Sequence, residues 1–269
     1  MEKNEHLLKS RRFLPMFLTQ FFGALNDNVY KQALLLVFTY GLISQQSANV
    51  STLNNLAALL FILPYFIFSA TAGQLADKYE RAQLVRAIKL LEMIIMLIAT
   101  AGFLLGSLWL LLTALFLMGA QSTFFGPIKY AILPEVLKPH ELMSGNAIFQ
   151  SGTSIAILLG MILGGAVISV SAGNLVWISL TVVIIALIGY ASSRFVLTQR
   201  VTAPDIQIDW NFFRTSFQTL KYAKSLPMIF LILLGNSWYW FCGATYLTTI
   251  PQLTQQNLHA YRCGFFALP

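Results

Sequence analysis

Four polar residues interrupt an apolar stretch near the start of the chain, and their types suit the binding of a charged ligand. Asn26, Asp27 and Asn28 are consecutive, and Lys31 follows Asp27 by one helical turn. The segments on either side, FLPMFLTQFF and ALLLVFTYGL, are almost entirely apolar. In a helix, residues i and i+4 lie on one face, so the carboxylate and the ammonium would point the same way. Such a face could bind a ligand with two opposite charges, or the Asp27–Lys31 pair could simply neutralise itself.

These polar residues lie deep in their apolar segment, which favours a functional role. Asp27 lies about 22 Å along a helix from Arg12, which marks the basic start of the segment. A charged side chain turned toward lipid costs about 2.5–3.5 kcal/mol, so such residues usually face a bundle interior or a water-filled cavity. The predicted substrate-binding residues are Asn26, Asp27, Asn28, Lys31 and Gln121.

Two other apolar segments also contain polar residues at depth. Gln121 and Ser122 stand near the middle of one segment and could line the same cavity. Glu92 stands in another, about two turns from its cytoplasmic end, where the membrane interface could solvate the carboxylate. Glu92 is therefore a further buried candidate whose role stays open.

The composition of the whole chain indicates an integral membrane protein. Of its 269 residues, 57% are hydrophobic and 10% are charged, whereas a soluble domain has about 25% charged residues. The mean hydropathy is +0.69. The chain contains several segments that are long and apolar enough to span a bilayer as helices, which predicts an all-α membrane protein. These segments cover residues 13–42, 53–76, 84–105, 108–133, 143–170, 175–196 and 227–250.

The basic residues favour one orientation of these helices. Of 17 Lys and Arg residues, all but Lys31 and Arg262 fall at or near one side. Basic connections remain in the cytoplasm, so we expect a cytoplasmic N-terminus in the inner (plasma) membrane of the cell. This topology also accounts for the net charge of +7 without nucleic acid as a partner. The connection between the second and third helices is predicted to carry Lys78, Arg81, Arg86 and Lys89.

One connection, residues 197–226, is long and has a pattern of its own. Trp210, Phe213, Phe217 and Leu220 recur at helical spacing with basic residues between them. This pattern is typical of an amphipathic helix on the cytoplasmic face of the membrane. A linker helix packed on the bundle is an equally good interpretation.

A charged motif, GQLADKYERAQ, follows the second helix. Gly73, Asp77, Lys78 and Arg81 match the pattern Gly-x-x-x-Asp-(Arg/Lys)-x-Gly-(Arg/Lys)-(Arg/Lys), in which glutamate and alanine here replace the second glycine and the last basic residue. The motif resembles the loop that latches the cytoplasmic side of major facilitator superfamily transporters. We expect Gly73 to allow close helix approach and the charged residues to pair at the cytoplasmic rim. An ordinary charged loop is the alternative.

A second motif, FFGPIKYAILPE, lies at the cytoplasmic end of the fourth helix. Gly126 and Pro127 can kink this helix and bring Lys129 near the inner surface, with Glu135 further on. Lys129 either takes part in gating or extends to the interface to keep its charge in water. The predicted cytoplasmic gate comprises Gly73, Asp77, Lys78, Arg81, Lys129 and Glu135.

The fifth helix contains GMILGG, which resembles a glycine-rich pattern of the same superfamily, with Met161 in place of the usual proline. Gly152, Gly160 and Gly164 are spaced by eight and four residues and share one face. Small residues let two helices approach closely. The predicted packing residues are Gly152, Gly160, Gly164 and Gly165.

Together, the first six helices and the charged motif resemble the N-terminal half of a major facilitator superfamily transporter. More narrowly, FLPMFLTQFFGALNDNVYKQALLL and FFGPIKYAILPE resemble the lysophospholipid transporter branch, especially transporter domains that are fused to acyltransferases. The resemblance implies a transporter that brings lysophospholipid to the inner leaflet for re-acylation. Its expected partners are membrane lipid, a lysophospholipid substrate and an acyltransferase.

The resemblance also implies a division of the chain. Residues 1–196 correspond to the six-helix half, 197–226 to a cytoplasmic linker, and 227–250 to a seventh helix that starts the second half. Residues 251–269 do not resemble the segment that follows in this family. We therefore expect a truncated or frame-shifted product.

An enzyme is not predicted. The acyltransferase signature His-x-x-x-x-Asp is absent after His6, His140 and His259, and there is no Gly-x-x-x-x-Gly-Lys-(Ser/Thr) loop for ATP. We predict no catalytic residues, no cofactor and no metal site. Two alternatives to lysophospholipid transport remain: a drug or small-metabolite exporter, and a non-transporting membrane module that partners an acyltransferase.

Overall fold

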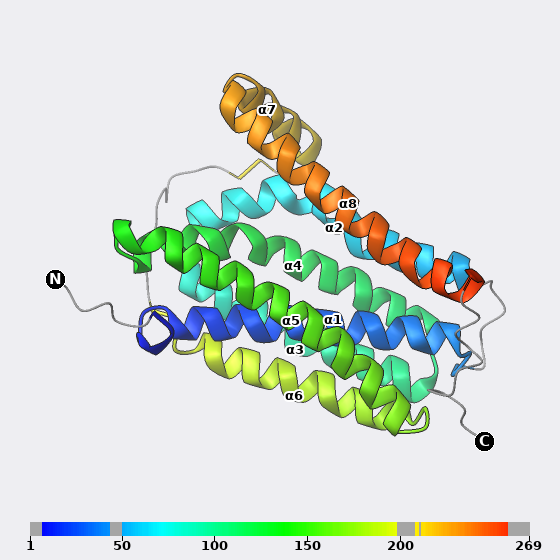
Figure 1. Ribbon diagram of the computed structural model, residues 1–269. Helices are drawn as coiled ribbons and strands as arrows, with labels where there is room; N and C mark the ends of the chain where they lie inside the picture. Colours follow the sequence, from blue (N-terminus) through cyan, green and yellow to red (C-terminus); the bar gives the residue numbers. More distant parts are fainter. Residues whose placement is uncertain (1–6, 44–49, 198–207, 210, 258–269) are drawn as a thin grey trace. The chain divides into compact units, whose positions relative to one another are not determined.

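The structure is a computed structural model that describes residues 7–43, 50–197, 208–209 and 211–257. All regular elements in these ranges are helices, which confirms the all-α prediction (Figure 1). Their bounds are η1 Leu7–Lys9, α1 Leu14–Thr39, α2 Val50–Lys78, α3 Arg81–Leu105, α4 Leu108–Val136, η2 Pro139–Glu141, α5 Leu142–Val170, α6 Leu175–Ser193, α7 Phe212–Lys224 and α8 Pro227–Asn257.

Several helices have the length and composition of membrane spans. Within the described ranges, the five helices α2–α6 qualify, and α7 with α8, bent by 115°, makes a sixth candidate. The chain is therefore a multi-pass membrane protein. Although α1 has 26 residues, it is not among these candidates, because the polar stretch from Asn26 to Lys31 lowers its hydropathy.

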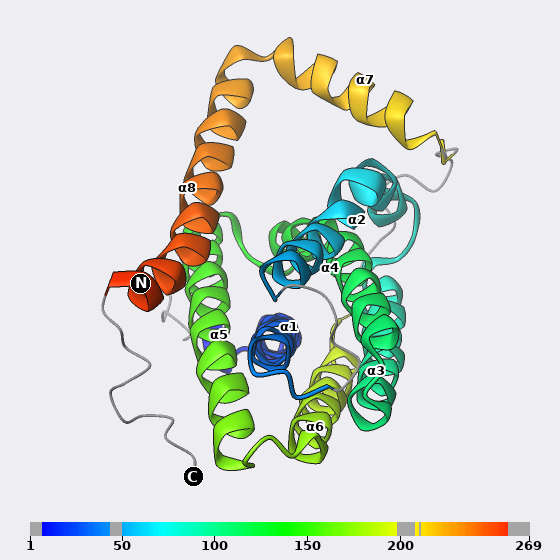
Figure 2. The same ribbon diagram turned by 90° about the vertical axis from the view of Figure 1, so that its right-hand side faces the viewer.

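Helix α1 lies in the middle of a bundle formed by α1–α6 (Figure 2). It packs on α5 and α6, while α3 packs on α4 and α6, and α2 packs on α4. Val29, Tyr30 and Val37 of α1 are completely buried. The Tyr30 hydroxyl donates a hydrogen bond to the Leu111 carbonyl at 2.8 Å and so attaches α1 to α4. This central place explains how a helix with a polar face is kept away from lipid.

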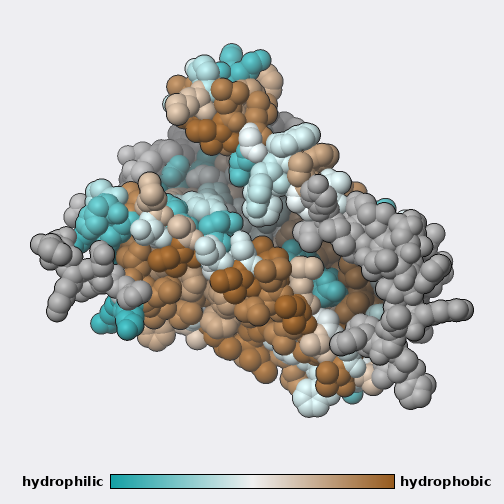
Figure 3. Space-filling view, in the orientation of Figure 1, coloured by the Kyte–Doolittle hydropathy of each residue, from teal (hydrophilic) through white to brown (hydrophobic). Residues whose placement is uncertain are grey.

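The outer surface of the bundle is apolar. Phe66 of α2, Trp109 of α4 and Val170 of α5 are each at least 76% exposed. Figure 3 shows apolar side chains over much of the face to which α5 contributes. A large apolar surface of this kind fits contact with lipid tails.

Helices α1 and α5 approach closely at the predicted glycine face. A Cβ on Gly160 would lie 2.6 Å from the Leu25 carbonyl oxygen, and one on Gly164 would lie 2.7 Å from that of Val29. A Cβ on Gly152 would collide with the Phe17 ring, whereas one on Gly165 would meet nothing within 4 Å. The first three glycines therefore make room for α1, and Gly165 does not.

The predicted connection between the second and third helices is wrong. Helix α2 continues to Lys78 and α3 begins at Arg81, so only two residues separate them. Residues 74–78 have no glycine or proline to end the helix. Arg86 and Lys89, which we expected in this connection, belong to α3.

From Phe213 onward the chain forms a second compact unit. In α7, basic Arg214, Lys221 and Lys224 accompany the exposed Phe217 and Leu220, as in an amphipathic helix. Helix α8 follows after two residues and extends seven residues beyond the predicted end at 250. Residues 198–207, Trp210 and 258–269, within the predicted linker and tail, lie outside the described residues. The proposed division of the chain stays a prediction.

Candidate functional site

The polar stretch of α1 turns toward both α3 and α4. Asn26 is completely buried, whereas Asp27, Asn28 and Lys31 are half-buried. Ser122 of α4 donates a hydrogen bond to Asp27 Oδ2 at 2.8 Å. The other carboxylate oxygen of Asp27, Oδ1, is buried and has no hydrogen-bond partner in the described part of the chain. Asp27 therefore has one oxygen held by α4 and one left unsatisfied.

Lys31 does not pair with Asp27. The four ion pairs within 4.0 Å among the described residues include neither of them. Instead, Lys31 Nζ lies 4.4 Å from the centre of the Phe61 ring of α2, a cation–π arrangement. Asp27 and Lys31 therefore form no direct ion pair in this structure. Asn28 uses its amide nitrogen to donate to the Ala24 carbonyl at 2.7 Å.

A buried ion pair lies behind the polar face. Lys89 Nζ and Glu92 Oε2, both from α3, are 2.6 Å apart, and each side chain is only 1% exposed. Glu92 also accepts hydrogen bonds at 3.2 Å from Asn26 of α1 and Gln121 of α4. The expectation that the membrane interface solvates Glu92 is therefore wrong, because the carboxylate is enclosed by three helices.

Asn26 and Gln121 thus differ from the other predicted substrate residues. Gln121 is 2% exposed, and both amides direct their NH2 groups to Glu92 rather than to open space. Sequence reasoning missed Lys89, because a basic residue near a helix start was taken as cytoplasmic. Its position three residues before Glu92, and more than two turns beyond Arg81, is the signal that could have identified it.

Three charged residues of the predicted gate, Asp77, Arg81 and Glu135, meet where α2 ends and α3 begins. Arg81, 6% exposed, forms ion pairs with Asp77, at 3.6 Å, and with Glu135 of α4. Its Nε also donates to the Ala76 carbonyl at 3.2 Å. One guanidinium therefore joins the ends of α2 and α4 to the start of α3, as a latch would require.

Lys78 and Lys129 form none of the ion pairs among the described residues. Lys78 Nζ lies 6.0 Å from the ring centre of Tyr79, and Lys129 Nζ lies 5.1 Å from that of Tyr130. A Cβ on Gly73 would meet nothing within 4 Å, so the expected close helix approach at Gly73 is wrong.

A further ion pair, which sequence reasoning missed, closes the connection between α4 and α5. Arg12 Nη2 lies 2.6 Å from Glu141 Oε1, and Arg12 also donates to the Val136 carbonyl at 3.2 Å. The Lys138 backbone N–H donates to Glu141 Oε2 at 2.8 Å. That hydrogen bond, followed by the Arg12 charge, lowers the pKa of Glu141 below its ordinary value. The start of α1 is thereby tied to the end of α4.

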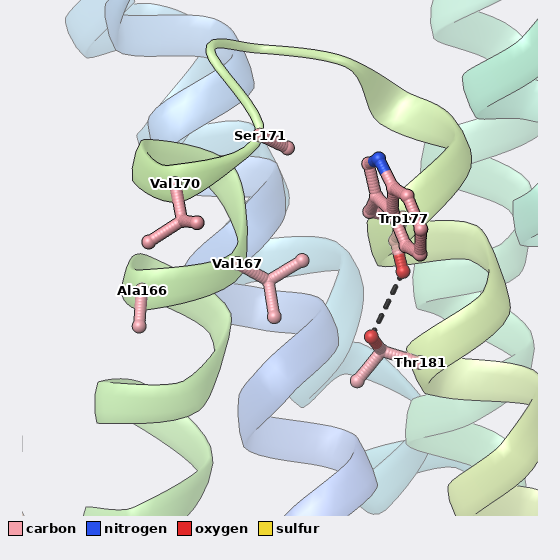
Figure 4. Close-up of a pocket in the computed structure, with 6 residues that line it drawn as sticks. All are labelled: Ala166, Val167, Val170, Ser171, Trp177 and Thr181. Atoms are coloured by element: carbon pink, nitrogen blue, oxygen red, sulfur yellow. Dashed lines mark hydrogen bonds between the residues drawn. The ribbon is translucent and has the colours of Figure 1, made fainter.

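A cavity of about 530 Å³ lies near the connection between α5 and α6 (Figure 4). It is mostly apolar, and the Thr181 hydroxyl that lines it donates to the Trp177 carbonyl at 2.8 Å. None of the polar residues of α1 lines it. The lining residues are Ala166, Val167, Val170, Ser171, Trp177 and Thr181. Among the described residues, no group of three or more His, Cys, Asp or Glu could hold a metal ion.

Comparison with known proteins confirms the predicted resemblance. The sequence model of the Major Facilitator Superfamily matches residues 16–269. The lysophospholipid transporter LplT of Cronobacter sakazakii is 25% identical over 247 residues, which cover 88% of this chain and 56% of that protein. LplT of Yersinia enterocolitica is 29% identical over 160 residues, which cover 59% of this chain and 36% of that protein. The chain thus matches between about a third and just over half of the length of these relatives.

Proposed function

This chain belongs to the major facilitator superfamily, a family of membrane transporters, and we propose that it moves lysophospholipid across the cytoplasmic membrane. Its similarity to proteins named lysophospholipid transporters supports this substrate class. Transport toward the inner leaflet would supply lysophospholipid for re-acylation, so an acyltransferase is the proposed partner.

The separation of two opposite charges on α1 is the observation that carries this proposal. Lys31 is held over Phe61, Asp27 keeps one oxygen without a partner, and the two form no direct ion pair, so each charge has a contact left for a ligand. A zwitterionic headgroup carries a phosphate and an ammonium on one short chain. Lys31 would contact the phosphate, and Asp27 the ammonium.

The remaining contacts follow from the half-buried and apolar surfaces. Asn28 lies beside Asp27 and would accept a hydrogen bond from the glycerol hydroxyl through its side-chain oxygen. Asn26 and Gln121 would act from behind through Glu92, because both are buried. The acyl tail would lie along apolar helix faces. At the cytoplasmic end, the Arg81 cluster would open and close during alternating access.

Uptake of labelled lysophosphatidylethanolamine tests this assignment in cells that lack their own lysophospholipid transporter and produce this protein. Asp27→Asn and Lys31→Ala each remove one charge and are expected to reduce uptake strongly at equal amounts of protein in the membrane. Lys224→Ala, which removes an exposed basic residue of α7, serves as the control and should leave uptake unchanged. Undiminished uptake by both site variants would refute the headgroup assignment.

A further inference from the structure

The Lys89–Glu92 pair needs an explanation that packing alone does not give. Each charge loses its water, and the pair repays that cost only when its hydrogen-bonding groups are satisfied. Both side chains are 1% exposed and lie 2.6 Å apart. Apolar side chains of similar volume are often at least as stable in such a place. The pair therefore points to a role other than stability.

The Lys89 ammonium is enclosed by residues of three other helices, and Gly23 of α1 leaves the room for it. A Cβ on Gly23 of α1 would collide with Lys89 Nζ, and one on Gly189 of α6 would lie 3.9 Å from it. The ammonium also lies 5.1 Å from the centre of the Phe125 ring of α4. Glu92 is thus held from one side by a lysine that is itself enclosed.

The other hydrogen bonds of Glu92 connect it to the candidate substrate site. Glu92 accepts from Asn26, the residue before Asp27, and from Gln121, the residue before Ser122. Ser122 in turn donates to Asp27 at 2.8 Å and lies 3.2 Å from the Gln121 side-chain oxygen. The Glu92 carboxylate therefore holds Asn26 and Gln121. The Ser122 hydroxyl then links α4 to Asp27 of α1.

We propose that Glu92, held by Lys89, is a positioning residue that sets the rotation of α1 against α4 and thereby aims the Asp27 carboxylate. This role rests on the proposed function, because it concerns the same site. Glu92 contacts no substrate. It acts through the amides of Asn26 and Gln121, and its hydrogen-bond acceptors, rather than its charge alone, are what the site requires.

Two double variants separate the acceptors from the ion pair. Lys89→Met with Glu92→Met removes both, whereas Lys89→Met with Glu92→Gln removes the ion pair but keeps an acceptor oxygen at position 92. We expect the KM for lysophosphatidylethanolamine uptake to rise about tenfold in the first variant, as for loss of a hydrogen bond to a charged group. The second variant should remain closer to wild type. The maximal rate per molecule in the membrane should change little in both.

A matched control tests whether any loosening of α1 has the same effect. Gln20 of α1 is 4% exposed and donates to Thr153 of α5 at 2.9 Å, so it makes a buried contact between helices that does not involve Glu92. Gln20→Met should leave the KM unchanged. Equal KM values in the two double variants, or an equal rise in Gln20→Met, would overturn the positioning role.

A second readout does not depend on the substrate. Asn28→Cys, with Cys242 and Cys263 replaced by serine, places a thiol beside Asp27 on the half-buried face. Its rate of reaction with a small thiol reagent should change with the Met–Met pair and stay near that of the Asn28→Cys protein with Lys89 and Glu92 intact when the Met–Gln pair is introduced. If wild type takes up no lysophosphatidylethanolamine but the rates differ in this way, the proposed function fails and the positioning role stands. Identical rates in both variants would contradict the positioning role.

Discussion

At the scale of single residues, Asp27 and Lys31 matter because they share a helix face without forming a direct ion pair. Two opposite charges one turn apart on a helix attract each other, and in a medium of low dielectric constant the attraction is strong. The Ser122 hydroxyl holds Asp27 toward α4, while the Phe61 ring holds Lys31 toward α2. The face is thus prepared for a ligand that carries both charges.

Phe61→Leu tests the cation–π contact that holds Lys31. Without the ring, the ammonium is free to turn to Asp27, so the KM for lysophosphatidylethanolamine uptake should rise by about two- to thirtyfold, the range of a cation–π interaction. Phe61→Tyr keeps the ring and should behave like wild type. An unchanged KM in Phe61→Leu would show that Phe61 does not position Lys31.

The sequence predicts Asp27 and Lys31 but not the pair behind them. A carboxylate and an ammonium four residues apart in an apolar segment are visible without a structure. The burial of Lys89, in contrast, depends on the space left by Gly23 in another helix. The sequence of α3 does not show that space, so we assigned Lys89 to the cytoplasmic side from the charge pattern alone.

At the scale of helices, the contact between α1 and α5 positions the site. The spacing of Gly160 and Gly164 predicts a packing face, and the structure identifies its partner as the backbone of α1 at Leu25 and Val29. Leu25 comes directly before the polar stretch and Val29 lies within it. The separation of α1 from α5 therefore fixes how deeply Asp27 lies in the bundle.

Gly160→Ala should destabilise the protein, and Gly165→Ala should not. A methyl group at position 160 would meet a backbone carbonyl at 2.6 Å and force the helices apart. Such overpacking lowers the free energy of unfolding by about 1–3 kcal/mol. At position 165 the added Cβ meets open space, and alanine favours a helix. Heating in detergent, followed by measurement of the protein that stays soluble, checks both. Equal midpoints for the two variants would contradict the packing role.

The charged motif predicts the ion pairs at the rim but not where the helices end. Its residues predict an ion-paired rim, and Arg81 does pair with Asp77 and Glu135. The pattern was taken as a loop, but most of it is the last turn of α2 and the first of α3, because helix-forming residues occupy positions 74–78. Helix ends are set by such local preferences, whereas the superfamily pattern records only residue types.

At the scale of the whole molecule, charge defines the two ends of the α1–α6 bundle. Arg12, Arg81 and Glu141 lie at one end, whereas the connection between α5 and α6 is uncharged. The superfamily places its substrate sites between two six-helix repeats. The polar face of α1 would then supply one wall of such a site.

Thiol labelling of intact cells tests the proposed orientation. Basic connections remain in the cytoplasm, so Lys138→Cys, between α4 and α5, should react with a membrane-impermeant reagent only after permeabilisation. Asn174→Cys, between α5 and α6, should react without it. Replacement of Cys242 and Cys263 by serine removes background labelling. The reverse pattern would place the N-terminus outside.

The ion pair within α3 also bears on how the protein enters the membrane during synthesis. Lys89 and Glu92 are three residues apart on the same helix, so each charge has its counter-charge before any other helix is in contact. An unpaired charge at the centre of a span raises the cost of insertion by about 2.5–3.5 kcal/mol. Helix α3 can therefore enter the translocon with Lys89 and Glu92 already paired. Its hydrogen bonds to Asn26 and Gln121 complete the network once α1 and α4 pack against it.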